Sequence, residues 1–171
     1  MTKLLIFITG VFLTVSIYTI TSENIDGGQI NFSSFQGKKI LIVNTASNSP
    51  YVSQYTGLEQ LYQQYHDSLV VIAFPSNSFG NEPGTNQEIK NFVMSTYNVH
   101  FLLGAKVPVT GVQKPAIYQW LTQQVQNGMM NSDVLYDFQK YLIDDDGTLI
   151  AVFGSNIHPM DSTIQNAITN N

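Results

Sequence analysis

Two short, uninterrupted apolar runs constrain the fold of this chain more than any other feature of its sequence. Residues 39–43 (KILIV) and 69–74 (LVVIAF) have the length of strands but lack the alternating polar residues of a half-exposed strand. Such runs are typical of strands that are covered on both faces of a sheet. Between them, in residues 55–66, apolar side chains recur at helical spacing. The pattern predicts a right-handed crossover in which one helix joins two parallel strands.

Further elements are predicted on either side of this unit. The pair Gly27-Gly28 predicts a small opening hairpin, and TNQE at residues 85–88 has the spacing of a capping box that begins a second helix. The other expected elements are a third helix over residues 116–125, a hairpin of residues 138–143 and 148–153 about the turn DDDG, and a short helix over residues 161–168. We expect one α/β domain with a mixed sheet and helices on both faces, in the order strand, strand, helix, strand, helix, helix, strand, strand, helix.

The composition excludes several classes of function. Seven lysines, no arginine and twelve acidic residues give a net charge of −5, so no nucleic-acid partner is expected. The chain contains no cysteine, which excludes disulfides, thiolate nucleophiles and cysteine-ligated metals. Its 171 residues are enough for one domain with a substantial core.

The N-terminus has the pattern of an export signal. Lys3 precedes an apolar run at residues 4–20, and a small, polar stretch lies at residues 19–22. We expect residues 1–22 to be a signal peptide or an N-terminal membrane anchor and residues 23–171 to form the domain, in a protein that is exported: periplasmic, secreted or membrane-anchored. The apolar run is at the lower limit of length for a membrane span, so attachment through residues 4–20 is an alternative to cleavage.

Polar loops follow both buried strands, at the edge of the sheet where open α/β domains place their sites. These loops are residues 44–50 (NTASNSP) and residues 74–84 (FPSNSFGNEPG). Because the carboxyl ends of parallel strands meet at one edge, we expect the two loops to lie together. They are therefore the first place to look for chemistry.

At these loops the chain resembles the glutathione peroxidases, hydroperoxide reductases with a thioredoxin-like fold. The matching segments are NTAS at residues 44–47 for the family's NVAS, FPSNSFG at 74–80 for FPCNQFG, EPGTNQEI at 82–89 for EPGSNxEI, and YDFQKYLID at 136–144 for WNFxKFLVD. The likeness covers residues 24–168 in order. It implies a thioredoxin-like fold and, in the family, a hydroperoxide substrate, a thiol reductant and a role in oxidative stress.

The resemblance also implies a set of site positions, and all of them are substituted. The family uses a Cys or selenocysteine assisted by Gln, Trp and Asn. The matching residues here are Ser49, Ser78, Tyr136 and Asp137. The second, resolving Cys of many members would match Ser76 or lie in the region from the first helix to the second, and Pro50 stands where the family has Gly. No cofactor is implied.

These substitutions predict the loss of the family's chemistry. Peroxide reduction needs a low-pKa thiolate that passes through a sulfenic acid, and a serine hydroxyl supplies neither. Asp137 adds an anion where the family has a neutral donor, which disfavours a thiolate beside it. We therefore expect a catalytically inactive exported homologue. The alternatives are a binding or scaffold module of the cell envelope and a residual non-thiol enzyme; the partner is unknown.

Other sites are weaker candidates on sequence grounds. Ser49 has no histidine near it in the sequence that would make it a hydrolytic nucleophile. A structural role, in which its hydroxyl caps the following helix, is the alternative. The turn at residues 144–146 lacks the calcium-loop spacing, and His66, His100 and His158 lack a zinc spacing, so no metal is expected. If the fold follows the family, Tyr136 lies with the other three substituted residues around a shallow, solvent-facing polar pocket.

Overall fold

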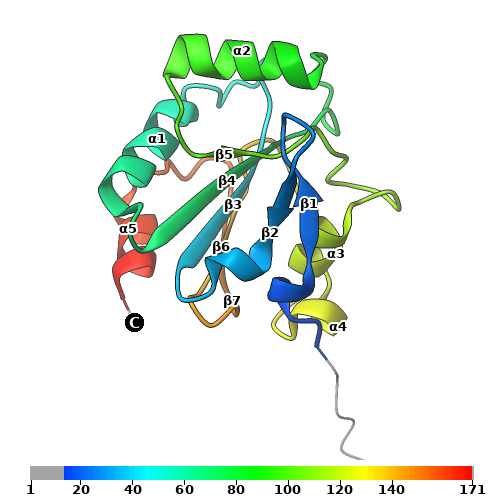
Figure 1. The fold of residues 1–171 in the computed structure, drawn as a ribbon, viewed down its shortest axis with the longest axis vertical. Helices are drawn as coiled ribbons and strands as arrows, with labels where there is room; N and C mark the ends of the chain where they lie inside the picture. Colours follow the sequence, from blue (N-terminus) through cyan, green and yellow to red (C-terminus); the bar gives the residue numbers. More distant parts are fainter. Residues whose placement is uncertain (1–13, 171) are drawn as a thin grey trace, which may run out of the picture.

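The computed structural model describes residues 14–170, which form a five-stranded mixed sheet with helices on both faces (Figure 1). The strands lie in the order β5-β4-β3-β6-β7, with bounds Leu102–Leu103, Leu69–Pro75, Lys39–Thr45, Lys140–Ile143 and Leu149–Phe153. A separate hairpin comprises β1 (Thr21–Glu23) and β2 (Gln29–Asn31). The helices are α1 (Gln54–Tyr65), α2 (Asn86–Tyr97), α3 (Ala116–Thr122), α4 (Gln124–Asn127) and α5 (Ser162–Thr169), with 3₁₀ helices η1 (Ile17–Thr19) and η2 (Phe32–Phe35).

Strand β3 is the centre of the sheet, and all seven of its residues are buried. It pairs in parallel with β4, in a register that sets Lys39 opposite Leu69, and antiparallel with β6, with Ile40 opposite Ile143. Helix α1 joins β3 to β4. The two parallel strands and the helix between them are therefore confirmed, and the apolar runs are apolar because both sheet faces are covered.

The two faces of β3 belong to two separate clusters of buried side chains. Leu41 and Val43 pack with apolar residues of α1, α2 and α5. Ile40 and Ile42 pack with residues of η1, β2, η2 and α3, among them Trp120. The mixed sheet with helices on both faces is thus confirmed, and the period-two alternation of β3 decides which residue enters which cluster.

The third predicted helix differs from the expectation, because residues 116–125 form two helices instead of one. Gln123 is extended, with φ −120° and ψ 114°, and separates α3 from α4. The side chain of Asn127 donates to the carbonyl oxygen of Trp120 (2.9 Å), and the amide of Gln124 donates to the side chain of Asn131 (2.9 Å). Asparagine side chains thus take both partners of the missing helical hydrogen bond.

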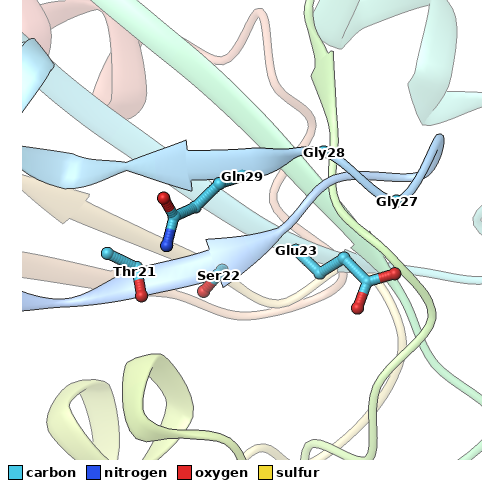
Figure 2. A pocket seen from close by; sticks show the side chains of 6 residues that line it. All are labelled: Thr21, Ser22, Glu23, Gly27, Gly28 and Gln29. Carbon is cyan, nitrogen blue, oxygen red and sulfur yellow. The ribbon is translucent and has the colours of Figure 1, made fainter.

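The opening hairpin is confirmed about Gly27-Gly28, although its first strand ends at Glu23 (Figure 2). The Asn24 side chain accepts hydrogen bonds from the amides of Asp26 and Gly28, both at 2.9 Å, so Asn24 begins the turn instead of extending the strand. Gly27 has a φ of 83°, which glycine adopts without strain. The two-residue strand β5 was not predicted, because so short a segment has no periodicity.

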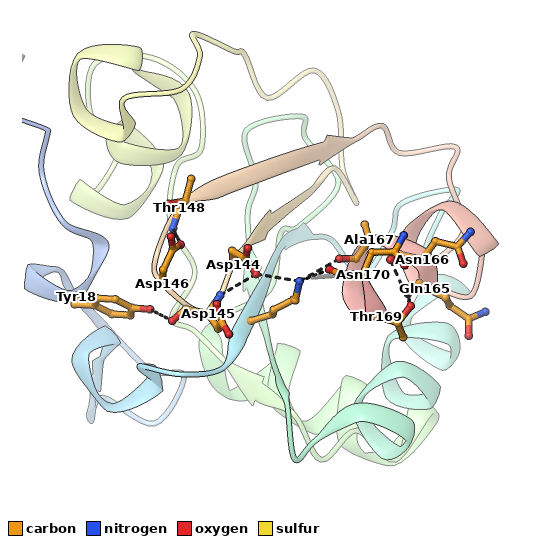
Figure 3. Close-up of polar contacts among 11 residues, drawn as sticks. Tyr18, Asp144, Asp145, Asp146, Thr148, Gln165, Asn166, Ala167, Thr169 and Asn170 are labelled. Carbon is orange, nitrogen blue, oxygen red and sulfur yellow. Dashed lines mark hydrogen bonds and ion pairs between the residues drawn. The ribbon is translucent and has the colours of Figure 1, made fainter.

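The C-terminal hairpin is confirmed as β6 and β7, and its acidic turn is fixed by local contacts (Figure 3). The Asp144 carboxylate lies 2.9 Å from the Lys39 ammonium, which holds the pKa of Asp144 below its ordinary value. The same ammonium donates to the carbonyl of Asn170 (2.9 Å), just past the C-terminus of α5. The Asp146 side chain accepts from the amide of Thr148 (2.8 Å), and the Tyr18 hydroxyl donates to the Asp145 carbonyl (2.7 Å).

The segment assigned to a signal peptide or anchor falls into two parts. Residues 1–13 lie outside the described residues. The remainder is packed into the domain: Ile17 is fully buried, and the Trp120 indole donates to the carbonyl of Val15 (2.6 Å). The amide of Val15, eight residues before Glu23, donates to the carbonyl of Gln126 (2.9 Å), so the packed part of the chain begins well before Glu23. Among the described residues, no helix has the length and apolar character of a membrane span.

We predict that Ile17 contributes to folding stability as a core residue. Ile17→Ala should lower the free energy of unfolding by about 2–5 kcal/mol, because it leaves a cavity in the cluster that covers β3. Urea denaturation of the full chain would measure this change. Thr21→Ala, at an exposed position of β1, is the matched control and should change stability by less than about 0.5 kcal/mol. Equal effects of the two substitutions would show that this segment is not part of the core.

Candidate functional site

The loop that leaves β3 carries Ser49 into a buried position, where its side chain is almost inaccessible to solvent (3% exposed). The Ser49 hydroxyl accepts a hydrogen bond from the amide of Tyr51 at 3.2 Å. Helix α1 begins later, at Gln54, with Ser53 as its N-cap residue. Ser49 therefore stabilises the turn before α1, and the expectation that it caps the helix itself is wrong.

The segment before β6 places Asp137 at the same edge of the sheet. Asn44 near the end of β3 holds this segment on both sides: its side chain donates to the carbonyl of Tyr136 (3.0 Å), and its carbonyl accepts from the amide of Phe138 (2.6 Å). Phe138 has a φ of 60°, unusual for a residue that is not glycine. Its buried ring packs edge-on against Tyr55, with ring centroids 5.3 Å apart. These contacts fix the direction in which Asp137 projects.

Asp137 is fully buried and lies with Asn81, Tyr136 and Ser49. The Asn81 side chain donates to one carboxyl oxygen of Asp137 (2.6 Å) and contacts the Tyr136 hydroxyl (3.2 Å). The second carboxyl oxygen of Asp137 has no hydrogen-bond partner among the described residues. Burial raises the pKa of Asp137, and the Asn81 amide and the Ser49 hydroxyl oppose that rise without cancelling it.

Ser78 is engaged elsewhere. Its hydroxyl accepts from the amide of Val109 (3.0 Å) and from the hydroxyl of Ser76 (3.1 Å), and Ser76 is fully buried. No hydrogen bond in the described part of the chain links Ser78 to Ser49, Tyr136 or Asp137. The structure thus brings three of the four candidate positions together and directs the fourth, with Ser76, into holding the loop after β4.

Two residues that were not singled out from the sequence organise the site. Asn81 is the partner of Asp137, and Glu82 is buried with one carboxylate oxygen accepting from the amide (2.7 Å) and the hydroxyl (2.8 Å) of Ser47. The carbonyl of Asn81 also accepts from the amide of Asn48 (3.0 Å). In the sequence, the only indication of a role for Asn81 and Glu82 was their position in the second polar loop. Their hydrogen bonds to Ser47 and Asn48 confirm that the two polar loops lie together.

Tyr136, which lies beside Asp137 and Asn81, packs against two other aromatic rings. The Tyr136 ring is half-buried between Tyr51 and Phe79, with centroid distances of 6.1 and 5.4 Å. Since Ser49 and Asp137 are both buried, the four substituted residues do not form the expected solvent-facing pocket. A hollow of about 280 Å³ beside Ser78 is lined by that residue, Asn77 and residues 106–108.

A second hollow, of about 330 Å³ and with a polar lining, lies on the β1–β2 hairpin (Figure 2). It is lined by the side chains of Thr21, Ser22, Glu23 and Gln29 and by the Gly27-Gly28 turn. It is open and shallow, and it contains no histidine or lysine that could activate a hydroxyl. The hollow is therefore a polar surface feature, and the buried group around Asp137 remains the candidate site.

None of the three histidines supplies a base to Ser49 in the described contacts. His100 contacts Glu59 of α1 (2.8 Å), and His66 contacts Asp67 (3.2 Å). His158 accepts from the amide of Met160 (3.2 Å) and packs against Gly57, where a Cβ atom would lie 2.6 Å from its ring. The arrangement that a serine hydrolase needs is not formed by these residues.

Comparison with known proteins identifies the family. A model of the family described as glutathione peroxidase matches residues 17–122, and its first matched residue is the buried Ile17. A glutathione peroxidase-like peroxiredoxin of Schizosaccharomyces pombe is 38% identical over 145 residues, covering 83% of this chain and 90% of its own. A hydroperoxy fatty acid reductase of Synechocystis is 37% identical over 152 residues, covering 84% of this chain and 89% of its own.

Solved structures agree with these sequence relatives. The crystal structure of Trgpx in apo form superimposes with a TM-score of 0.70 at 28% identity, covering 90% of this chain and 93% of that one. A thiol:disulfide interchange protein from Chlorobium tepidum, at 14% identity and a TM-score of 0.61, shares the fold alone. The α/β fold is therefore thioredoxin-like, and the chain belongs to the glutathione peroxidase family as a divergent member without cysteine.

Proposed function

We propose that this protein is a non-catalytic member of the glutathione peroxidase family that works outside the cytoplasm as a binding or scaffold module. The observation that carries the proposal is the absence of cysteine from the whole sequence. In thiol-dependent reduction, a thiolate attacks one peroxide oxygen, the O–O bond breaks, and sulfur is oxidised to a sulfenic acid. A serine hydroxyl has neither the low pKa nor an accessible oxidised state for this step.

The surroundings of Ser49 support the same conclusion. The hydroxyl is buried beside Asp137, so a peroxide would reach it only after side chains had moved. Among residues 14–170, one oxygen of the neighbouring Asp137 carboxyl has no hydrogen-bond partner. A carboxylate at this place disfavours a second negative charge, which is the charge that an activated nucleophile must carry.

The site residues instead support the fold. Asp137 and Asn81 hold the segment before β6 against the loop after β4, while Glu82 holds that loop against the one after β3. These contacts give the group a structural role that needs no reaction, which supports the proposal. A binding role is consistent with a domain in which only 11% of the residues are charged, and export is supported by the sequence pattern of residues 1–22.

We predict no hydroperoxide turnover by the purified full chain. Consumption of hydrogen peroxide and of a fatty acid hydroperoxide would be measured with glutathione and then with thioredoxin as reductant. The rate should equal that of a control without protein, while a cysteine-containing relative assayed in parallel should be active. Turnover that survives repurification and disappears in Ser49→Ala would overturn the proposal.

We also predict that the site resists a restored thiolate. In Ser49→Cys the introduced thiol is the only one in the chain, and its pKa should lie above the ordinary value of about 8.5 because of burial and the Asp137 carboxyl. Adding Asp137→Asn should lower that pKa by about one unit. The pH dependence of alkylation by iodoacetamide measures both values.

Ser95→Cys, at an exposed position of α2, provides the reference thiol for this measurement. Its pKa should not respond to Asp137→Asn. An equal thiol pKa in Ser49→Cys and in Ser49→Cys/Asp137→Asn would show that the Asp137 carboxyl does not disfavour a thiolate at position 49.

A third prediction concerns stability and pH. Because burial raises the pKa of Asp137, the folded state keeps a proton that the unfolded state releases, so stability falls as pH rises from the ordinary Asp pKa through the raised one. Asp137→Asn should remove this fall and raise the free energy of unfolding at pH 7 by about 1 kcal/mol. Urea denaturation at a series of pH values from the ordinary Asp pKa upward would test it. Asp67→Asn, at a side chain that is 99% exposed, should leave the profile unchanged.

A further inference from the structure

A hollow of about 200 Å³ lies where the two polar loops meet the start of α2. Its apolar lining includes Ile89, which is buried, and Phe92, which is half-buried. Its charged lining consists, within residues 14–170, of the carboxylates of Glu82 and Glu88. We call it the Glu82 hollow. Two carboxylates without a lysine or histidine in the same lining favour a cation over an anion.

Glu82 is a buried residue, only 1% exposed, whose carboxylate is only half used by the protein. Its Oε2 accepts from the amide (2.7 Å) and the hydroxyl (2.8 Å) of Ser47. Its Oε1 accepts no hydrogen bond from residues 14–170. This oxygen points toward Gly84, where a Cβ atom would lie 3.5 Å from it, and Gly84 lines the hollow. A buried carboxylate oxygen without a donor is costly, and a ligand that donates to it would recover the loss.

The start of α2 neither supplies this donor nor calls for an anion. Thr85 and Glu88 form a capping box: the Thr85 amide donates to Oε2 of Glu88 (2.8 Å), and the Glu88 amide donates to the Thr85 hydroxyl (3.3 Å). The bonds from the Thr85 amide and hydroxyl lower the pKa of Glu88, so this side chain stays charged. The positive end of the helix is therefore already matched by a carboxylate of the protein.

The two lysines of this region are held by other partners. The Lys106 ammonium donates to the carbonyl of Gly84. Its charge contributes to the lowered pKa of Glu88, but the two side chains do not form an ion pair. The Lys90 ammonium lies 2.7 Å from the carboxylate of Asp26. Neither lysine lines the Glu82 hollow, so a positive charge for it must come from outside residues 14–170.

The chemistry of the lining defines the kind of cation. An ammonium group donates strong, charge-assisted hydrogen bonds to a carboxylate oxygen. A metal ion fits less well, because residues 14–170 contain no group of three His, Asp or Glu side chains placed to bind one. The side chains of Ile89 and Phe92 offer contact to a short alkyl chain, and the volume of the hollow admits only a small ligand.

We propose that the Glu82 hollow binds a small primary alkylammonium ion, whose N–H groups donate to Oε1 of Glu82 while its alkyl chain lies against Ile89 and Phe92. Glu88, which is exposed, adds a second negative charge. Asp137 does not line the hollow, so its occupancy does not depend on whether Ser49 retains chemistry. A chain that binds no amine could still lack turnover.

Titration of the isotope-labelled full chain with n-butylammonium chloride, at constant ionic strength and followed by amide NMR shifts, tests the proposal. The amides of Ser47, which donates to Glu82, and of Gly84 should shift in a saturable way, with a Kd in the millimolar range. The amide of Gly147, next to the acidic turn at residues 144–146, is the control and should not follow this curve. Butan-1-ol, which has the same chain without the charge, should bind at least about tenfold more weakly.

Two variants locate the ligand. Glu82→Gln removes the charge but keeps an oxygen that can accept from Ser47, and it should weaken binding about tenfold. Gly84→Ala keeps the carboxylate and narrows the hollow, because its Cβ atom would lie 3.2 Å from Ile89, and it should weaken binding by a similar factor. Glu23→Gln, at an exposed position of β1, is the matched control and should leave the Kd within about twofold.

Four outcomes would overturn the proposal. The first is the absence of a saturable shift of the Ser47 amide. The second is equal binding of butan-1-ol, which would assign the hollow to apolar contact alone. The third is an equal shift at Gly147, which would show a general attraction of cations by an acidic chain. The fourth is an unchanged Kd in Glu82→Gln or Gly84→Ala, in a variant whose amide spectrum is that of the folded protein.

Discussion

The requirement that β3 be covered on both faces organises this protein. A strand of seven buried residues cannot lie at an edge or against solvent, so it needs a hydrogen-bonded neighbour on each side and an apolar layer on each face. Strands β4 and β6 provide the neighbours. Helices α1, α2 and α5 form one layer, and η1, η2 and α3 form much of the other.

The same constraint builds the site. Asn44 lies near the end of β3, and its two hydrogen bonds capture the segment of residues 136–138. The parallel pairing of β3 with β4 brings the loops that follow them to one edge, where Glu82 links them through Ser47. The arrangement of the site is thus a consequence of strand register.

The sequence was most informative where one interaction dominated a whole segment. Burial on both faces made β3 and β4 visible as apolar runs, and a single helical stripe made α1 visible between them. It was least informative where side chains compete with the backbone or where packing is remote. Asn127 takes a backbone partner from the helix that was expected to continue past Gln123. The burial of Ile17 beneath β3 depends on contacts that no local pattern records.

For the site, the family resemblance supplied the positions, whereas the contacts needed the structure. That Ser49 and Asp137 share one buried group with Asn81 follows from how two loops pack. Ser78 occupies a matching position in the chain, yet its hydroxyl bonds to Val109 instead. Matching residue types along a sequence cannot reveal which hydrogen-bond partner a side chain takes. The short Ser78 side chain bonds to neighbouring groups, whereas a longer amide side chain at the same position could reach more distant ones.

The left-handed backbone at Phe138 has a consequence for the evolution of the protein. A residue with a Cβ atom in this conformation costs about 1 kcal/mol, and the contacts of Phe138 with Asn44 and Tyr55 offset that cost. The folding of the domain therefore holds the backbone beside Asp137 in place. Exchanging the side chains of the site leaves that main chain as it is, so variation at those positions is separate from variation of the backbone that carries them.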